Sequence, residues 1–372
     1  MKDVIAIYTG WAEDYWDEQS VANGMPGSET WATEISVAFA NKGYHVIIFG
    51  NPSIWHFDEH GVEYIPYTLM NNIISRQKID YFIFSRDISP INAWIECPNI
   101  YVQLHDPHII HLPNSGLKLD KIKKFCCISQ WQKYNVQKEE DCIELTNDRF
   151  FKGINGVNQN LYLTQGLPVK KNQMVWSSAC DRDFLSLMKY VIPKILQVVP
   201  DFKVHICYGF ERVINAGREH IVNEVKDIMN QYPDTYIYHG NVSKKALADL
   251  QLESKVWFYS PIAQESFCIT AVENALAMNA LVIAPTFGFK DTLQEGRYPF
   301  FINLSQYDWE NKVDSVFTKM ANTVISLLID EQKRIQHAKA AFNICIQYTW
   351  ENAADIWINE WKNDKINGNQ LL

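Results

Sequence analysis

Two glutamates, Glu265 and Glu273, flank seven residues at the start of a predicted helix. A carboxylate just before a helix can accept hydrogen bonds from sugar hydroxyls, and the free amides of the first turn can hold a diphosphate. The second carboxylate could then accept the hydroxyls of a ribose. If all the intervening steps were helical, the rise between the two residues would be roughly 12 Å, about the reach of a hexose–diphosphate–ribose unit. The pair alone is a weak signal, because glutamates also occur at this spacing by chance.

A glycine-containing segment, Gly24-Met25-Pro26-Gly27-Ser28-Glu29-Thr30, follows the first predicted strand and opens a helix. Glycine lets a backbone approach a ligand closely, Ser28 can cap the helix, and the amides at a helix start attract anions. The segment matches neither the dinucleotide fingerprint Gly-x-Gly-x-x-Gly nor a P-loop, which disfavours an NAD enzyme or an ATPase. Two interpretations stay open, a plain loop and an anion-binding loop around Gly27 and Ser28.

His105 directly follows a predicted strand at residues 100–104, at the strand end where α/β active sites gather. His108 and His111 stand close by, so a zinc site has to be considered. We expect no metal, because Pro107 breaks any helix that would bring the three rings to one face and no cysteine or glutamate is near in sequence. His105 either contacts a substrate or is a structural histidine with satisfied hydrogen bonds.

Arg182 lies in the segment Ser177-Ser178-Ala179-Cys180-Asp181-Arg182-Asp183, between a predicted strand and a predicted helix. An arginine in this place can bind a diphosphate through two parallel hydrogen bonds. A salt bridge to Asp181, to Asp183 or to another carboxylate explains it equally well.

Short β-branched and aromatic runs alternate with amphipathic segments along the chain, which is typical of α/β proteins. A loose polar stretch after Asn158 interrupts this alternation, which then starts afresh. Two Rossmann-like, doubly wound domains that face a central cleft are the simplest model, because ligands bind outside the carboxyl ends of parallel strands. We expect an N-terminal, acceptor-binding domain at residues 1–168 and a nucleotide-sugar-binding domain at 169–347. Residues 348–372 should form a helix that packs back on the first domain.

The predicted strands and helices follow from these runs. Strands are expected at residues 4–8, 45–49, 81–85, 100–104, 125–129, 174–177, 203–208, 236–239, 256–259 and 281–284. Helices are expected at residues 28–41, 183–197, 217–230, 244–253 and 267–278.

Composition excludes several classes of function. The net charge of −9 over 372 residues disfavours a nucleic-acid-binding surface. The eight cysteines show no Cys-x-x-Cys spacing and indicate reduced core residues of a cytoplasmic protein. The N-terminus is predicted to be a strand and not a signal peptide, and no apolar run is long enough to span a membrane. A short lysine cluster consists of Lys118, Lys121, Lys123 and Lys124. These lysines either form a solvent-exposed face or make a weak peripheral contact with an anionic membrane.

Taken in order along the chain, these motifs resemble one family. The same succession of motifs also includes Ile128-Ser129-Gln130-Trp131, Asn155-Gly156-Val157-Asn158, Gly240-Asn241-Val242-Ser243 and Leu281-Val282-Ile283-Ala284. The succession is similar to that of the retaining glycosyltransferases of family 4 (group 1 type), which have the GT-B fold. The resemblance extends from Gly10 to about Trp361 and is most specific in the block from Glu265 to Glu273.

The resemblance implies catalytic roles for Glu265, His105 and Arg182. Glu265 would accept hydrogen bonds from the donor hexose, His105 would contact this sugar near the reacting carbon, and Arg182 would neutralise the diphosphate. Glu273 would hold the ribose. The donor-binding residues would be Gly27, Ser28, Ser266, Phe267, Cys268, Ile269, Thr270 and Glu273.

The implied activity is transfer of a hexose-type sugar from a UDP- or GDP-sugar to a hydroxyl of a glycan or glycolipid. Neither metal nor cofactor is expected, because basic side chains and helix amides replace the cation. Acceptor contacts are expected around residues 11–19 and 55–60, where aromatic side chains could stack on sugar rings. Two alternatives stay open, a sugar-nucleotide 2-epimerase of the same fold and a catalytically silent protein that binds a nucleotide sugar or a glycan.

Several positions depart from the family pattern. Cys268 stands where the family usually has Gly, and Asn274 where it has Ala. Ser177 takes the place of the arginine in the family's Arg–Lys phosphate pair, which leaves Arg182 in the place of the lysine. Gly288-Phe289 replaces a Gly-Gly pair. The motif therefore locates a donor site without identifying the donor.

Overall fold

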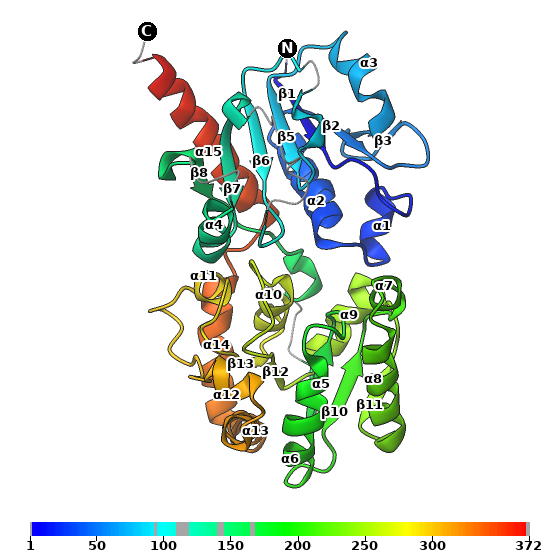
Figure 1. The fold of residues 1–372 in the computed structure, drawn as a ribbon, viewed down its shortest axis with the longest axis vertical. Coiled ribbons are helices and arrows are strands. Elements are labelled where there is room, and N and C mark those ends of the chain that lie inside the picture. Colours follow the sequence, from blue (N-terminus) through cyan, green and yellow to red (C-terminus); the bar gives the residue numbers. More distant parts are fainter. Residues whose placement is uncertain (1, 93–94, 109–118, 140–144, 164–167, 370–372) are drawn as a thin grey trace. The chain divides into compact units, whose positions relative to one another are not determined.

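The computed structural model describes residues 2–92, 95–108, 119–139, 145–163 and 168–369, with side chains up to residue 366 (Figure 1). The chain divides into two compact units. Unit 1 consists of Met1–Gly156 and Tyr348–Leu372, and unit 2 consists of Val157–Gln347. The division comes earlier than the boundary expected after residue 168. Tyr162 explains part of the difference, because it is buried within unit 2 and donates a 2.7 Å hydrogen bond to Gln251.

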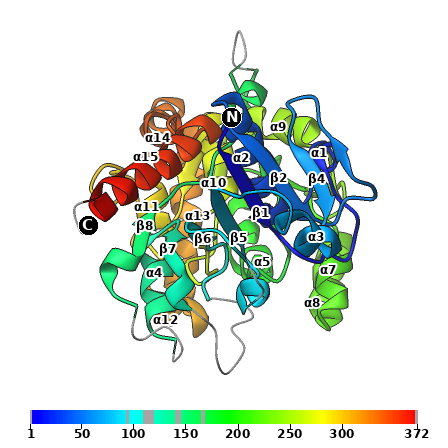
Figure 2. The same cartoon turned by 90° about the horizontal axis from the view of Figure 1, so that it is seen from above.

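Unit 1 is built on one eight-stranded sheet with the order β3-β4-β2-β1-β5-β6-β7-β8, and Figure 2 shows most of these strands in that order. All neighbouring strands are parallel except β3 and β4, which are antiparallel. The central strands are buried and mostly apolar, as expected for a parallel sheet buried on both faces, with the polar Ser85 and Gln103 at the ends of β5 and β6. The strands are β1 (Val4–Tyr8), β2 (His45–Gly50), β3 (His56–Phe57), β4 (Glu63–Pro66), β5 (Tyr81–Ser85), β6 (Ile100–Gln103), β7 (Ile122–Cys127) and β8 (Phe150–Lys152).

Helix α2 and the C-terminal helix α15 pack against each other and against one face of this sheet. α2 contributes an apolar stripe that includes Trp31, Ile35 and Phe39, all fully buried. On α15, the Trp361 ring stacks on Tyr81 at 4.1 Å between centroids. The helices of unit 1 are α1 (Glu18–Ala22), α2 (Gly27–Asn41), α3 (Met70–Ile74), α4 (Gln130–Gln137) and α15 (Trp350–Asn369).

Unit 2 has a three-stranded sheet, β11-β10-β9, and a two-stranded sheet, β12-β13, both parallel. A bridge between Lys171 and Ser254 and the stacking of Trp176 on Tyr259 place β12 beside β9. The sequence predicted longer strands in a single doubly wound sheet. The strands of unit 2 are shorter, and they form two separate sheets. They are β9 (Gln173–Trp176), β10 (Lys203–Ile206), β11 (Tyr236–Tyr238), β12 (Val256–Phe258) and β13 (Ala280–Val282).

Helices lie between successive strands of unit 2 as far as β13, and the remaining helices then follow one another. The helix predicted at residues 183–197 is present in three parts, because the π-helical segment η7 (Leu187–Val191) separates α5 from α6. The helices are α5 (Phe184–Ser186), α6 (Ile192–Leu196), α7 (Glu211–Asn215), α8 (Glu219–Gln231), α9 (Lys244–Leu252), α10 (Ile269–Leu276), α11 (Phe289–Thr292), α12 (Gln306–Glu310), α13 (Asp314–Ile329) and α14 (Glu331–Cys345).

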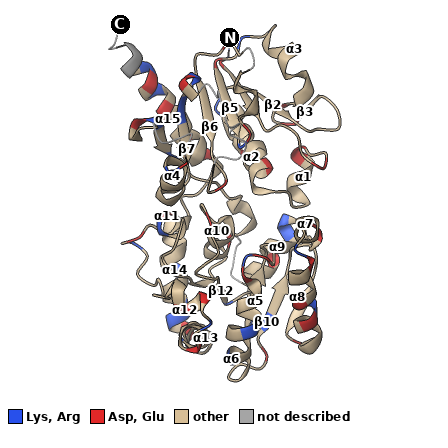
Figure 3. Cartoon of the chain, in the orientation of Figure 1, with Lys and Arg blue, Asp and Glu red and all other residues tan. Residues whose placement is uncertain are grey.

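Acidic and basic residues are interspersed along the elements of both units (Figure 3). Among the described residues, no helix has the length and apolar character needed to cross a membrane. Within the lysine cluster, Lys124 pairs with Asp364 at 2.7 Å and also with Glu360, while Lys123 donates to Asn99 at 2.7 Å. Lys118 lies outside the described residues, and the membrane contact stays a prediction.

Candidate active site

The loop between β12 and α10 places Glu265 in a half-buried position. Glu265 Oε1 accepts a 2.8 Å hydrogen bond from the hydroxyl of Tyr259, which directly follows β12 and is buried. Burial raises the pKa of Glu265, and the charge of Arg182 and the Tyr259 hydrogen bond oppose this rise only in part. The carboxylate is a partly desolvated acceptor with one guanidinium nearby.

Gly288 fixes the backbone of this loop. Its amide donates to the Glu265 carbonyl at 2.9 Å. A Cβ at this position would lie 2.1 Å from the Ser266 carbonyl oxygen, a separation that real structures do not allow. The Thr292 hydroxyl donates to the Phe267 carbonyl from the next helix. Gly288 is therefore required by close backbone packing, whereas the next residue, Phe289, packs in the core.

Cys268 is the N-cap residue of α10 and has left-handed backbone angles, φ 61° and ψ 77°. Glycine adopts this conformation without steric cost, which gives a physical reason for the glycine in the related motif. The Cys268 thiol is buried, and burial raises its pKa well above the ordinary value, so it is a neutral thiol. No side chain caps α10, and the Ser266 hydroxyl is buried with no partner among the described residues. The helix start thus offers amides and one hydroxyl to a ligand.

Arg182 is exposed and donates from Nη1 to the Gln264 carbonyl at 3.0 Å. It lines a pocket of about 430 Å³ together with Gln264 and Ala263. Among the described residues, no carboxylate lies within ion-pair distance of its guanidinium. The proposed salt bridge to Asp181 is not formed, because Asp181 pairs with Arg218 at 2.5 Å. Arg182 therefore lies beside the Glu265 loop with donor groups available to an anion.

Asp183, which the sequence suggested only as a partner of Arg182, has a different role. It accepts hydrogen bonds from Ser186 at 2.5 Å, from Ser260 at 2.5 Å and from the Trp309 indole at 2.7 Å. Three donors satisfy the carboxylate, and they join the Arg182 segment to the start of the Glu265 loop. Asp183 is a positioning residue that no local sequence pattern indicates.

Glu273 is buried in α10, with only 5% of its side chain exposed. Its Oε1 atom pairs with Lys244 Nζ, from the first turn of α9, at 2.9 Å. The sequence analysis assigned the carboxylate to a ribose and did not anticipate this lysine. In the structure any ligand of Glu273 also meets the Lys244 ammonium group.

In unit 1, His105 follows β6 and is held by two neighbours. Its Nε2 atom lies 2.9 Å from the Ser85 hydroxyl at the end of β5, and its ring packs edge-on against Trp31 at 5.4 Å. Burial, with a smaller effect of the Arg86 charge, lowers the pKa of His105 to about 3. His105 is therefore a neutral imidazole at physiological pH.

The second pocket, about 450 Å³, lies in unit 1 at the carboxyl ends of β1 and β5. Ser28 is one of its residues, but it does not cap α2, because the helix begins at Gly27 and the Ser28 hydroxyl donates to Glu29 at 2.7 Å. That part of the prediction was wrong. Sequence analysis also missed Arg86, whose Nε atom pairs with Asp106 at 2.8 Å; only its place directly after a strand could have indicated it. The lining residues are Thr9, Trp11, Ser28, Glu29, Ser85, Arg86, Asp87 and Ser89.

The histidines considered for zinc have separate partners. His108 is exposed and pairs with Glu139 at 3.2 Å, whereas His105 bonds to Ser85. A glutamate is thus close to His108 in space although none is near in sequence. His111 lies outside the described residues.

We predict that Gly288→Ala lowers the free energy of unfolding by about 1–3 kcal/mol, because the new Cβ forces the Glu265 loop to move. Urea denaturation measures this change. Gly27→Ala is the matched control, since a Cβ there meets nothing within 4 Å, and it should change stability by about 1 kcal/mol or less. Equal effects of the two substitutions would contradict the close packing at Gly288.

We predict that His105→Gln makes the protein less sensitive to acid. The folded-state pKa of about 3 lies below the ordinary 6.5, so the unfolded chain binds more protons between these values and stability falls as the pH drops from 6.5 toward 3. Between about pH 7.5 and pH 4.5, the variant should lose about 1–2 kcal/mol less unfolding free energy than the wild type. The control is His220→Gln, on an exposed part of α8, and a variant at position 105 with the wild-type pH profile would refute the burial argument.

Solved structures with this fold are numerous, whereas no family model matches the sequence and no curated protein does. A glycosyltransferase from Rickettsia africae matches with a TM-score of 0.71 and 15% identity, over 97% of this chain and 98% of that one. Sucrose-phosphate synthase from Thermosynechococcus elongatus matches with a TM-score of 0.70 and 12% identity, over 99% of this chain and all of that one. Anabaena HepE, solved with UDP and glucose, matches with a TM-score of 0.68 and 14% identity, over 97% of this chain and all of that one. The chain therefore has the GT-B fold of glycosyltransferases.

Proposed function

We propose that this protein is a retaining glycosyltransferase of the family 4 type that moves a hexose from a nucleoside-diphosphate sugar to a hydroxyl of a glycan or glycolipid. The observation that carries the proposal is the half-buried Glu265 carboxylate, which accepts the Tyr259 hydroxyl and lies near the charge of Arg182, just before α10. A desolvated acceptor forms strong hydrogen bonds with sugar hydroxyls, since water does not compete for it. The fold adds support, because its solved relatives include glycosyltransferases.

The donor diphosphate would bind at the start of α10. The backbone amides of residues 266–270 can donate to phosphate oxygens, and Arg182 supplies a positive charge from the neighbouring segment. In this proposal helix amides and arginine stabilise the leaving diphosphate, and the chemistry requires neither metal nor cofactor. Ser177 lies 3.5 Å from the Thr270 hydroxyl and replaces the family's second phosphate cation by a neutral donor.

The ribose would bind at Glu273. Lys244 occupies Oε1, so we assign the ribose hydroxyls to Oε2, with the ammonium group fixing the carboxylate in place. Uridine is the preferred base in this proposal, because Anabaena HepE was solved with UDP and glucose and an Escherichia coli relative with UDP-2-fluoro glucose. A GDP-sugar remains the second donor to be tested.

Unit 1 would contact the acceptor. His105 is neutral and has its Nε2 atom engaged by Ser85, which leaves Nδ1 for a sugar hydroxyl. Trp11, with 70% of its surface exposed, can stack on a sugar ring at the pocket that also contains Ser28. The acceptor hydroxyl would attack from the face that the diphosphate leaves, with a phosphate oxygen as the base. We place this reaction in the cytoplasm, at or near a membrane when the acceptor is a lipid.

We predict that Glu265→Gln removes most sugar transfer, at least about a hundredfold in kcat, while UDP binding and the fold persist. The side-chain oxygen of glutamine can still accept the hydrogen bond from the Tyr259 hydroxyl. Glutamine lacks the negative charge that strengthens hydrogen bonds to the donor sugar. The assay is product formation from labelled UDP-sugars and GDP-sugars with glycan acceptors. Glu295→Gln, an exposed change on the same unit, is the control.

The same protein samples distinguish the proposed transferase from the two alternative functions, a 2-epimerase and a silent binding protein. A thermal-shift series with UDP, GDP, ADP and their sugars reports donor binding, since a ligand at 100 times its Kd stabilises by about 2.7 kcal/mol. Epimerised donor without any acceptor would identify a 2-epimerase, and nucleotide binding without turnover would identify a silent binding protein. Near-normal transfer by Glu265→Gln would refute the assigned role of this carboxylate.

A further inference from the structure

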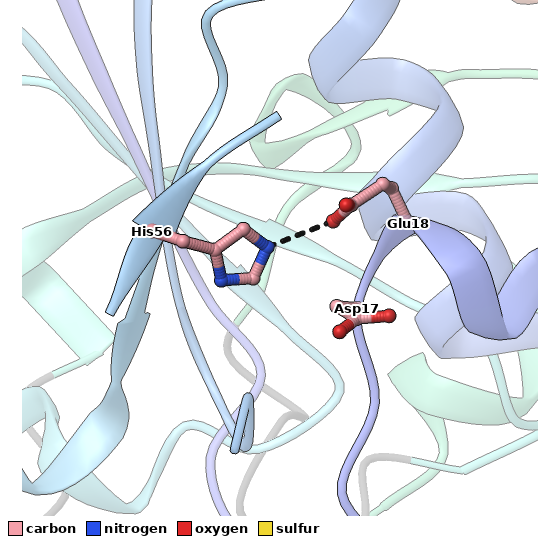
Figure 4. A group of neighbouring side chains, drawn as sticks. All are labelled: Asp17, Glu18 and His56. Atoms are coloured by element: carbon pink, nitrogen blue, oxygen red, sulfur yellow. Dashed lines mark hydrogen bonds and ion pairs between the residues drawn. The ribbon is translucent and has the colours of Figure 1, made fainter. Parts of the chain in front are cut away.

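A second group of ionisable side chains lies in unit 1, outside all residues assigned to the donor. It consists of Asp17 and Glu18 at the start of α1 and His56 on β3. One oxygen or nitrogen atom from each residue lies within 4.8 Å of the others. Figure 4 shows the His56 ring pointing from β3 toward the Glu18 carboxylate, and the His56 Nε2 atom lies 2.9 Å from Glu18 Oε2. Three potential ligands from two separate segments therefore converge on one point.

The His56 ring is oriented by contacts outside the group. Its Nδ1 atom lies 3.0 Å from the Ile54 carbonyl oxygen, and its face stacks on Tyr64 at 5.1 Å with an interplanar angle of 4°. A histidine that binds a metal commonly donates its other ring N–H to a backbone carbonyl, which fixes the tautomer and the ring plane. Nδ1–H donates to Ile54, and Nε2 faces the carboxylates, where in the metal-free protein it carries the proton of the hydrogen bond to Glu18.

The charge around this imidazole is strongly negative. Asp58 adds a third carboxylate that interacts with Glu18, and its Oδ2 atom is buried with no partner among the described residues. Within the described part of the chain, no lysine or arginine lies within 4.0 Å of Asp17, Glu18 or Asp58. Histidines are the cationic partners here, His56 beside Glu18 and His60 near Asp58, so a divalent cation would relieve the repulsion among the three carboxylates.

We propose that Asp17, Glu18 and His56 bind one zinc ion, with water as the fourth ligand. One imidazole and two carboxylates match the nitrogen and oxygen ligands that Zn²⁺ accepts in tetrahedral sites, whereas Mg²⁺ and Ca²⁺ prefer oxygen alone. Asp17 can serve as a ligand without losing its cap of α1, because the cap uses Oδ1 and leaves Oδ2. On binding, zinc replaces the proton that Nε2 shares with Glu18.

The ion would join α1 to β3, which are distant in sequence. The segments around these elements carry several exposed apolar side chains, namely Trp11, Tyr15, Ile54, Trp55 and Phe57. A zinc ion that links the two segments would fix the surface on which these apolar side chains lie. Because the ion binds only the folded chain, zinc should raise the melting temperature of the full chain. This role is structural and does not depend on the proposed sugar transfer.

The test is calorimetric titration of the chelator-treated full-length protein with zinc chloride, followed by visible spectroscopy with Co²⁺ in place of zinc. We expect one saturable site per chain, and His56→Gln and Asp17→Asn should each weaken it about tenfold or more. Asp17→Asn is the sharper variant, since asparagine still caps a helix and removes only the anionic ligand. His60→Gln, a change four residues from His56 at an exposed position, should bind zinc like the wild type.

Circular dichroism confirms that each variant is folded before titration. Zinc binding that is unchanged in both folded variants would overturn the proposal, and so would the lack of a saturable site in the wild type. Tighter binding of Mg²⁺ than of Zn²⁺ would contradict the assigned ligand chemistry. None of these outcomes affects the donor-site assignment, because the titrations contain no nucleotide.

Discussion

The partly desolvated Glu265 carboxylate is the constraint on which the candidate donor site depends. A charged group removed from water is costly unless hydrogen bonds and an opposite charge compensate it. The Tyr259 hydroxyl and the nearby Arg182 supply this compensation, and both come from the ends of neighbouring strands in unit 2. The backbone then has to hold the carboxylate in this position, which explains the close packing at Gly288 and the left-handed N-cap at Cys268.

The rest of unit 2 maintains this arrangement. Asp183 joins the Arg182 segment to Ser260 and to Trp309, so the two segments that carry the charged groups cannot move independently. In unit 1, a hydrogen bond likewise joins side chains at two strand ends. It links Ser85, at the end of β5, to His105, which follows β6. In both units the chemistry-bearing side chains follow parallel strands, where short loops are held by a buried sheet.

Sequence alone predicted the features that depend on local patterns. The fold class and the buried strands followed from β-branched runs, and the helix after Glu265 followed from its motif. The short strands β3, β4 and β8 were missed, because they contain only two to four residues with no clear alternation. The Ser28 cap was wrong because α2 begins one residue earlier, at Gly27, with Pro26 as its N-cap residue and no side-chain cap.

Side-chain partners were the least predictable feature, because they join residues distant in sequence. Nothing near Glu273 in the sequence indicates Lys244, and nothing near Arg182 indicates that Asp181 belongs to Arg218. The grouping of Glu18 with His56 likewise arises only when β3 returns beside α1. Such pairs are set by tertiary packing, which a single sequence does not reveal.

The most direct test of the donor site is a crystal structure of the protein with UDP. We predict that the diphosphate binds the first-turn amides of α10, with Arg182 on its oxygens and the ribose at Glu273. UDP bound elsewhere, with the loop from Glu265 to Cys268 free of ligand, would contradict it.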